Sequence, residues 1–397
     1  MALDSPECTS HYRSKLATGL STLEDYGTTC DMDSEWAKLR STLHQAASET
    51  IGFTQKHHQD WFDNSSVEIQ ELLDAKRKAH AALLANPHSP SLLHHYKTTR
   101  AETQKQLRLM ENEWWLKKAQ EIQGYADANN TYTFYAAAKS IYGPQKRSIA
   151  PVRSADGHVL FKDKQQILER WAEHFDSLLN KINPSDPLVL NALPDLPPSP
   201  FLDDPPMFSE VLTAIRSLKN NKSPGPDGIP AEILKKGGYL LTQKLFHFIL
   251  AIWHREALPQ EWKDSNIVTI YKKKGDKSSC GNSRGISLLS VAGKVLVKIM
   301  LSRLSFLTEG ILPGTQCGFR KNQSTLDMIF AARQIQEKCR EQNKDLYITF
   351  IDLTKAFDTV DRDLLWSILR KFGVPPQVSQ HPKTVSQWYA GLCTCRQ

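Results

Sequence analysis

The sequence predicts an α+β protein that is rich in helix. Apolar residues recur at helical spacing along residues 1–183, β-prone runs occupy residues 267–271 and 346–351, and eight of the 21 prolines lie between Pro184 and Pro206. The chain has 397 residues, of which 40% are hydrophobic and 23% charged, as in ordinary globular proteins. This composition excludes collagen-like, mucin-like and wholly disordered chains.

The N-terminal half is expected to be helical. Residues 1–60 form a poorly defined segment in which three apolar side chains share one helical face: Trp36, Leu39 and Leu43. A capping-box sequence begins a helix at Ser65, and a longer helix follows from Ser91 to a plausible stop at Gly124. These two helices predict a hairpin within a helical region of residues 61–183. The second helix has a basic face, which suits either a polyanion or simple solvation.

A hairpin and a short helix precede the proline cluster. The dipeptide Asp156-Gly157 between apolar residues predicts a β-hairpin, and an amphipathic helix follows with Ile167, Trp171 and Phe175 on one face. Residues 184–206 are too rich in proline for a helix or a central strand, so we expect a linker and a domain boundary there.

Residues 207–376 are expected to form a second domain. Its predicted elements are a helix capped by Ser209, a turn block at 223–230, a helix from Leu241, a strand at 267–271, a helix at 291–307, a buried strand at 346–351 and a helix at 361–372. Residues 377–397 lose this patterning, and we expect a divergent, disordered tail.

Positive charge is concentrated in one segment. The formal net charge is +7, and the window from Lys263 to Arg303 accounts for all of it, with nine Lys or Arg against two acidic residues. Such a segment in an otherwise neutral chain favours a polyanionic partner such as nucleic acid, although a solvated basic loop is the alternative. No apolar run is long enough to span a bilayer, and the N-terminus does not resemble a secretory signal. The seven scattered cysteines indicate reduced thiols, hence an intracellular protein of the cytoplasm or nucleus with no membrane and no disulfide-linked partner.

Asp352 ends the second β-prone run and is the best candidate for chemistry. Metal-assisted phosphoryl transfer needs rigidly held carboxylate oxygens, which Mg²⁺ prefers, and a strand end supplies that rigidity. The alternative is that Asp352 only caps a turn and that Asp358 or Asp361 caps the next helix.

Several sequence blocks occur in a characteristic order around this carboxylate. They are KSPGPDGIP at 222–230, IVTIYKKKGD at 267–276, SRGISLL at 283–289, QCGFRKNQST at 316–325 and FIDLTKAFD at 350–358. In this order they resemble the fingers and the first palm motif of the reverse transcriptases of non-LTR (LINE-type) retrotransposons. The resemblance runs from about Trp61 to Val374, and the stretch RWAEHF at 170–175 resembles the connector between endonuclease and polymerase. It implies an incomplete fingers–palm fold for residues 207–376.

The resemblance implies a role for each matching residue. Asp352 would be the first catalytic aspartate and a Mg²⁺ ligand, and Leu353 would add its backbone carbonyl to the metal. Lys272 and Arg284 would hold the incoming triphosphate, and Phe357 would exclude the ribose 2′-hydroxyl. The residues that would contact RNA template or DNA are Lys273, Lys274, Lys277, Arg320 and Lys321. Ser283 departs from the family, which usually has an aromatic residue before the arginine.

A larger departure concerns the catalytic carboxylates. The family requires an aromatic-Ala-Asp-Asp hairpin downstream of the first aspartate, and no Asp-Asp pair follows Asp352 in this sequence. We therefore expect a truncated RNA-directed DNA polymerase that is catalytically inactive, because one carboxylate cannot hold two metal ions. The alternatives are a remnant that binds RNA or DNA without sequence preference, and a non-functional, partly folded product.

Overall fold

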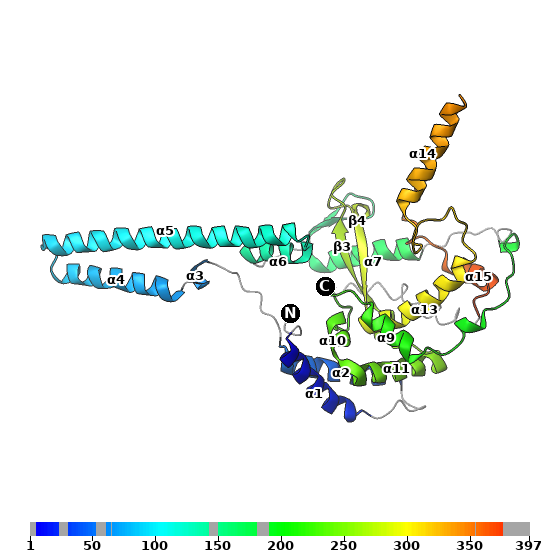
Figure 1. The fold of residues 1–397 in the computed structure, drawn as a ribbon, viewed down its shortest axis with the longest axis horizontal. Coiled ribbons are helices and arrows are strands. Elements are labelled where there is room, and N and C mark those ends of the chain that lie inside the picture. Colours follow the sequence, from blue (N-terminus) through cyan, green and yellow to red (C-terminus); the bar gives the residue numbers. More distant parts are fainter. Residues whose placement is uncertain are drawn as a thin grey trace. The chain divides into compact units, whose positions relative to one another are not determined.

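The computed structural model describes residues 5–23, 31–52, 61–64, 66–142, 150–180, 190–353 and 355–375. The described chain is mostly helical with small two-stranded sheets, in agreement with the α-rich α+β fold class predicted from the sequence (Figure 1). It divides into two compact units, one formed by residues 1–52 with 150–397 and the other by residues 53–149. The expected tail at 377–397 lies outside the described residues.

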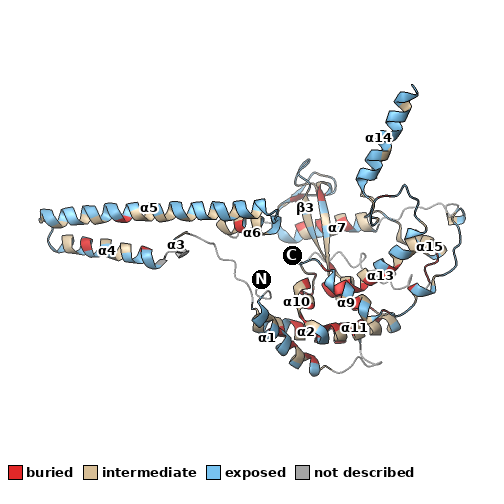
Figure 2. Cartoon of the chain, viewed as in Figure 1, coloured by how far each residue is buried: buried red, intermediate tan, exposed pale blue. Residues whose placement is uncertain are grey.

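The unit of residues 53–149 is a helical hairpin with additional short helices. Its elements are α3 (Trp61–Asn64), α4 (Ser66–Ala85), α5 (Pro90–Asp127) and α6 (Thr131–Tyr142). Helices α4 and α5 pack against each other and bury Ile69, Ala79 and Thr103, which confirms the predicted hairpin. Helix α5 continues through Gly124, because a single glycine costs a helix only about 1 kcal/mol. Most of α5 is exposed (Figure 2).

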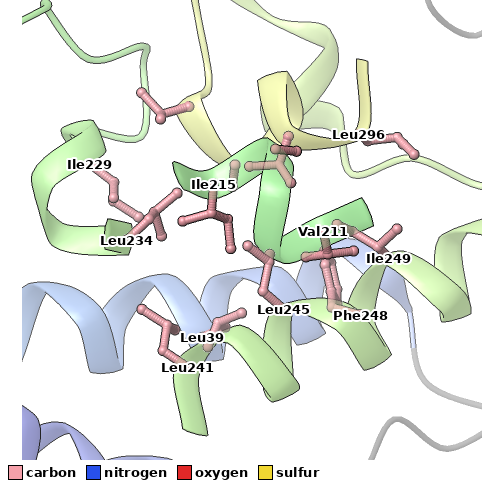
Figure 3. Packing of buried hydrophobic residues seen from close by; sticks show 14 of the residues in the cluster. Leu39, Val211, Ile215, Ile229, Leu234, Leu241, Leu245, Phe248, Ile249 and Leu296 are labelled. Atoms are coloured by element: carbon pink, nitrogen blue, oxygen red, sulfur yellow. The ribbon is translucent and has the colours of Figure 1, made fainter. Parts of the chain in front are cut away.

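The larger unit has one extended apolar core. The helices that build it are α1 (Pro6–Ser21), α2 (Met32–Thr50), α9 (Phe208–Arg216), α10 (Ala231–Lys236), α11 (Gly238–Arg255) and α13 (Val291–Glu309). In α11 the buried residues Leu241, Leu245, Phe248 and Ile252 recur every three or four positions, so one face of the helix is apolar. Figure 3 shows this face against Leu39 of α2 and Val211 of α9.

The same unit carries two β-hairpins beside helix α7. Strands β1 (Val152–Arg153) and β2 (Leu160–Phe161) are antiparallel, as are β3 (Ser265–Tyr271) and β4 (Ser283–Leu289). Short helices η2 (Pro200–Leu202), α12 (Gln260–Lys263) and η3 (Cys280–Asn282) lie in the connections. Helix α7 (Lys164–Leu179) buries Ile167, Trp171 and Phe175, the face predicted from the sequence.

The turn block at 223–230 fixes the junction between β4 and α13. Ser290 caps α13 by accepting a bond from the Gly293 amide at 3.3 Å, and its hydroxyl donates to the Asp227 carboxylate at 2.6 Å. A Cβ on Gly225 would lie 2.4 Å from the Leu289 and Ser290 backbone, so only glycine allows this approach. Burial raises the pKa of Asp227, and the Ser290 bond acts in the opposite direction.

The described part of the proline-rich segment is bonded to the C-terminal end of α15 (Arg362–Lys371). The Leu196 amide donates to the Lys371 carbonyl at 2.7 Å, and the Ser199 amide donates to the Gly373 carbonyl at 2.8 Å. Gly373 has a φ of +85°, and a Cβ there would lie 2.5 Å from the Pro197 carbonyl oxygen. The segment therefore packs against α15 rather than acting only as a spacer.

Three predictions of elements need correction. Ser209 is not a cap, since α9 begins at Phe208 and Glu210 accepts the Met207 amide. Residues 346–351 do not form a buried strand: they have no regular structure, and Tyr347 and Phe350 are each 90% exposed. A strand needs a neighbouring strand to satisfy its backbone, and none of the described strands pairs with this segment. Helix α14 (Thr325–Glu341) was not predicted, and it buries no residue.

Candidate nucleotide and nucleic-acid site

The β3–β4 hairpin positions the basic residues predicted to meet the triphosphate. Its register places Ile270 opposite Arg284 and Tyr271 opposite Ser283, and the Lys272 amide continues the ladder by donating to the Asn282 carbonyl at 2.9 Å. Lys272 and Arg284 thus lie two register positions apart at one end of the hairpin. Both side chains are exposed.

The two faces of this hairpin differ. A Cβ on Gly285 would lie 2.6 Å from the Phe175 ring, so helix α7 covers the face that Gly285 shares with its partner Thr269. Arg284 belongs to the alternate set of residues, as do the apolar side chains of Val268, Ile270 and Ile286, which are 41–49% exposed. The hairpin therefore presents a cation next to an open apolar surface.

The loop between β3 and β4 has a defined conformation. The Asp276 carboxylate accepts the Ser278 amide at 2.9 Å, and Asn282 donates to the Asp276 carbonyl at 2.9 Å. Arg153 of β1 contacts the same carboxylate at 3.1 Å. These bonds fold the loop on itself and leave three lysine side chains exposed: Lys273, Lys274 and Lys277.

Asp352 and Leu353 lie on the irregular segment that follows α14. Both residues are exposed, and within the described part of the chain no hydrogen bond or ion pair joins Asp352 to Lys272 or Arg284. The described residues also contain no group of three His, Cys, Asp or Glu side chains that could hold a metal ion. Asp352 and the Leu353 carbonyl are oxygen donors of the kind Mg²⁺ prefers, but they do not form a binding site by themselves.

Phe357 is paired with a second exposed aromatic residue. Its ring meets the Phe319 ring edge-on, with centroids 5.4 Å apart and planes at 87°. Phe357 is 77% and Phe319 is 94% exposed, and Phe319 has a φ of +61°, which a bulky residue rarely adopts. The structure thus joins the QCGFR block to the FIDLTKAFD block through two solvent-facing rings, a surface suited to the flat apolar parts of a nucleotide.

Arg320 and Lys321, predicted to contact nucleic acid, differ in their surroundings. The Arg320 side chain is only 8% exposed, pairs with Glu309 at 3.0 Å and donates to the Pro313 carbonyl at 2.7 Å. It holds the turn after α13, so its guanidinium group is already engaged. Lys321 is exposed.

Sequence reasoning did not identify two residues at this site, His174 and Lys355. The Lys355 ammonium group lies 3.5 Å from Nε2 of His174 on α7. Burial, together with the positive charges of Lys355, Arg170 and Lys272, lowers the pKa of His174 to about 4. Burial and the charge of Lys272 also lower the pKa of Lys355. Both residues lie inside blocks already noted, RWAEHF and FIDLTKAFD, but only the tertiary structure brings the blocks together.

No helix in the described ranges is long and apolar enough to cross a membrane.

Comparison with known proteins agrees with the order of the sequence blocks. Residues 271–396 match the family model described as "Reverse transcriptase (RNA-dependent DNA polymerase)". The chain is 25% identical over 348 residues to the "Probable RNA-directed DNA polymerase from transposon BS" of Drosophila melanogaster, which covers 85% of this chain and 37% of that protein. It is 24% identical over 265 residues to the RNA-directed DNA polymerase from mobile element jockey of the same species, covering 64% of this chain and 28% of that protein.

A further relative is the Pol polyprotein of the type-1 retrotransposable element R1 of Bradysia coprophila. It is 30% identical over 204 residues, which are 48% of this chain and 19% of that protein. The chain thus spans well under half the length of each of these relatives.

Proposed function

We propose that this chain, whose C-terminal region is a reverse transcriptase domain distantly homologous to those of non-LTR retrotransposons, supplies the fingers and the first palm motif of an RNA-directed DNA polymerase. The observation that carries the proposal is the β3–β4 hairpin, which presents Lys272, Arg284 and the exposed loop lysines on one ordered element. Reverse transcriptases act on nucleic acid, and cations on an ordered hairpin suit phosphate groups.

The exposed rings of Phe319 and Phe357 support a site for the nucleotide sugar. Phe357 precedes Asp358 in the block that matches the first palm motif, and its ring faces solvent rather than the core. A ring in this position would discriminate against a 2′-hydroxyl by overlap, without a hydrogen bond. Exclusion of the 2′-hydroxyl therefore remains the proposed role of Phe357.

We also propose that the 397-residue chain binds nucleic acid without extending a primer. Asp352 is the only carboxylate that the resemblance assigns to the metals, and it does not assemble a metal cluster with the other described residues. RNA and DNA would be held through their phosphates, without sequence preference. This partner choice implies an intracellular location.

The packing of the larger unit favours a folded binding protein over a partly folded product. Trp36, Phe248 and Trp262 are at most 2% exposed and meet one another at centroid distances of 5.2–5.7 Å. Such a core is expected to hold the hairpin in place, because interiors at this density resist rearrangement.

Binding of a labelled RNA–DNA primer–template, measured by fluorescence anisotropy over a range of salt concentrations, tests the proposal. Replacing Lys273, Lys274 and Lys277 by alanine should reduce the slope of log K against log salt by about 0.7–0.9 for each phosphate group that the variant no longer neutralises. A matched control replaces Lys164, Lys219 and Lys338, which are also exposed, and should leave the slope unchanged.

An equal effect of both triple variants would contradict the assignment of the hairpin. In the same samples, primer extension with Mg²⁺ or Mn²⁺ should not exceed that of Asp352→Asn, and extension above that control would overturn the proposed inactivity of the chain.

A further inference from the structure

Helix α7 lies outside the residues that match the reverse transcriptase model, yet it contributes to the surroundings of the FIDLTKAFD block. His174 of α7 and Lys355 of that block approach to 3.5 Å, although they are 181 residues apart. Phe175, the next residue of α7, packs against Gly285 of β4. The histidine is therefore anchored between the basic hairpin and the segment that carries Phe357.

The groups around His174 are mostly cationic. Lys272 and Lys355 come from the IVTIYKKKGD and FIDLTKAFD blocks, and Arg170 comes from the preceding turn of α7. All three act on the histidine strongly enough, together with burial, to lower its pKa to about 4, so the ring is neutral at neutral pH.

The nearby acidic groups do not cancel this charge. Glu173 is bound to Arg170 at 3.1 Å, and its side chain is 60% exposed. Asp358 opposes the fall in the pKa of Lys355 without reversing it. Burial raises the pKa of the Cys280 thiol, so that group stays neutral as well. Two lysines thus remain close together beside a neutral imidazole, an arrangement that costs free energy in the absence of an anion.

We infer that Lys355 and Lys272 form a binding site for the phosphate groups of a nucleotide, in which His174 positions the Lys355 ammonium group. This rests on the proposed function for the position of Lys272 but adds a phosphate-binding lysine and a positioning residue from α7. A neutral imidazole accepts a hydrogen bond from the ammonium group at Nε2 and fixes its direction. The remaining ammonium protons of Lys355 are available to phosphate oxygens, which form short, strong bonds with cations.

Inorganic tripolyphosphate is the probe, because it carries the charge of a nucleotide without base or sugar. Isothermal titration of the full chain should show binding that Lys355→Ala weakens at least about fivefold, whereas Lys355→Arg should retain most of it. Lys139→Ala, an exposed lysine of α6, is the matched control and should have no effect. Circular dichroism checks that each variant folds. Equal affinity of the wild type and Lys355→Ala would overturn the inference, as would the absence of binding.

The role of His174 has a spectroscopic signature. With ¹³C-labelled histidine, the resonance that His174→Gln removes should report a pKa near 4 in the free chain. Tripolyphosphate should raise that pKa by about half a unit or more, since a nearby anion favours the imidazolium form. A resonance that does not respond to the ligand would show that His174 is only structural.

The outcome is separable from that of the primer–template experiment, which varies Lys273, Lys274 and Lys277. Tripolyphosphate binding without nucleic-acid binding would retain this inference and reject the proposed function. The reverse result would do the opposite.

Discussion

His174 shows how burial and charge together determine the protonation of a single side chain. The ring packs against Trp171 and Phe175 on one helix and meets the Lys355 ammonium group through Nε2. An imidazolium ion in this place would face like charges with little water, so the neutral ring is favoured. The same environment makes the histidine a useful reporter of ligands, because any anion that enters changes its pKa.

The stability of the chain should depend on pH through His174. Its pKa is lowered to about 4 in the folded state from an ordinary value of 6.5, so below pH 6.5 the unfolded chain binds a proton that the folded chain does not. This contribution is complete above pH 6.5, falls as the pH drops toward 4, and is constant below that.

Urea denaturation at several pH values would test this prediction. His174→Gln should lose less stability than the wild type between pH 6.5 and 4, with similar behaviour of the two proteins above pH 7. Parallel curves across the whole range would contradict the lowered pKa.

At the scale of elements, the contact between β4 and α7 depends on the absence of a side chain at one position. Gly285 lies under the Phe175 ring and beside Ile267, with a Cβ at that site 2.6 Å and 3.1 Å from them. Neither neighbour can give way easily, since Phe175 is only 5% exposed. This glycine is needed for close approach rather than for backbone conformation.

Gly285→Ala should therefore destabilise the protein by about 1–3 kcal/mol through overpacking. Gly124→Ala offers a control with the opposite sign. Gly124 lies inside α5, where an added Cβ would have nothing within 4 Å, and alanine favours a helix by about 1 kcal/mol. Thermal unfolding of both variants tests the pair. A neutral Gly285→Ala would show that α7 can move away from the sheet.

At the scale of the whole molecule, Arg303 of α13 joins three parts of the larger unit. Its side chain is 4% exposed, binds both Glu210 oxygens at 2.6 and 2.8 Å, and donates to the carbonyls of Asp204 and Pro205. Its guanidinium carbon lies 5.3 Å from the Phe201 ring centre. Burial would raise the pKa of Glu210, but the Arg303 bonds outweigh it and the pKa is lowered.

Arg303→Met should cost about 3 kcal/mol or more in the free energy of unfolding, because Glu210 and two carbonyls lose their partner in the interior. Lys338→Met breaks the exposed Lys338–Glu341 pair, whose side chains are 65% and 62% exposed, and should cost well under 1 kcal/mol. Chemical denaturation measures both. Similar losses would mean that Arg303 is not a structural link.

The sequence by itself determined the elements whose stability is local or whose pattern is strong. The apolar spacing in α2, α7 and α11, the turn at Asp156-Gly157 and the cap at Asp361 all led to elements that the structure contains. The basic hairpin was placed correctly as well, since β3 and its loop carry their signals within a few residues. The order of sequence blocks identified the reverse transcriptase family, which the comparisons confirm.

Only the tertiary structure decided which distant segments meet. Residues 346–351 have the composition of a buried strand, but a strand is stabilised by a partner, and the described strands provide none. The pairing of Phe319 with Phe357 and of His174 with Lys355 joins segments that are far apart in the sequence. Local patterns carry no information about such contacts, because packing against other segments, rather than residue spacing, brings these side chains together and sets the pKa of His174.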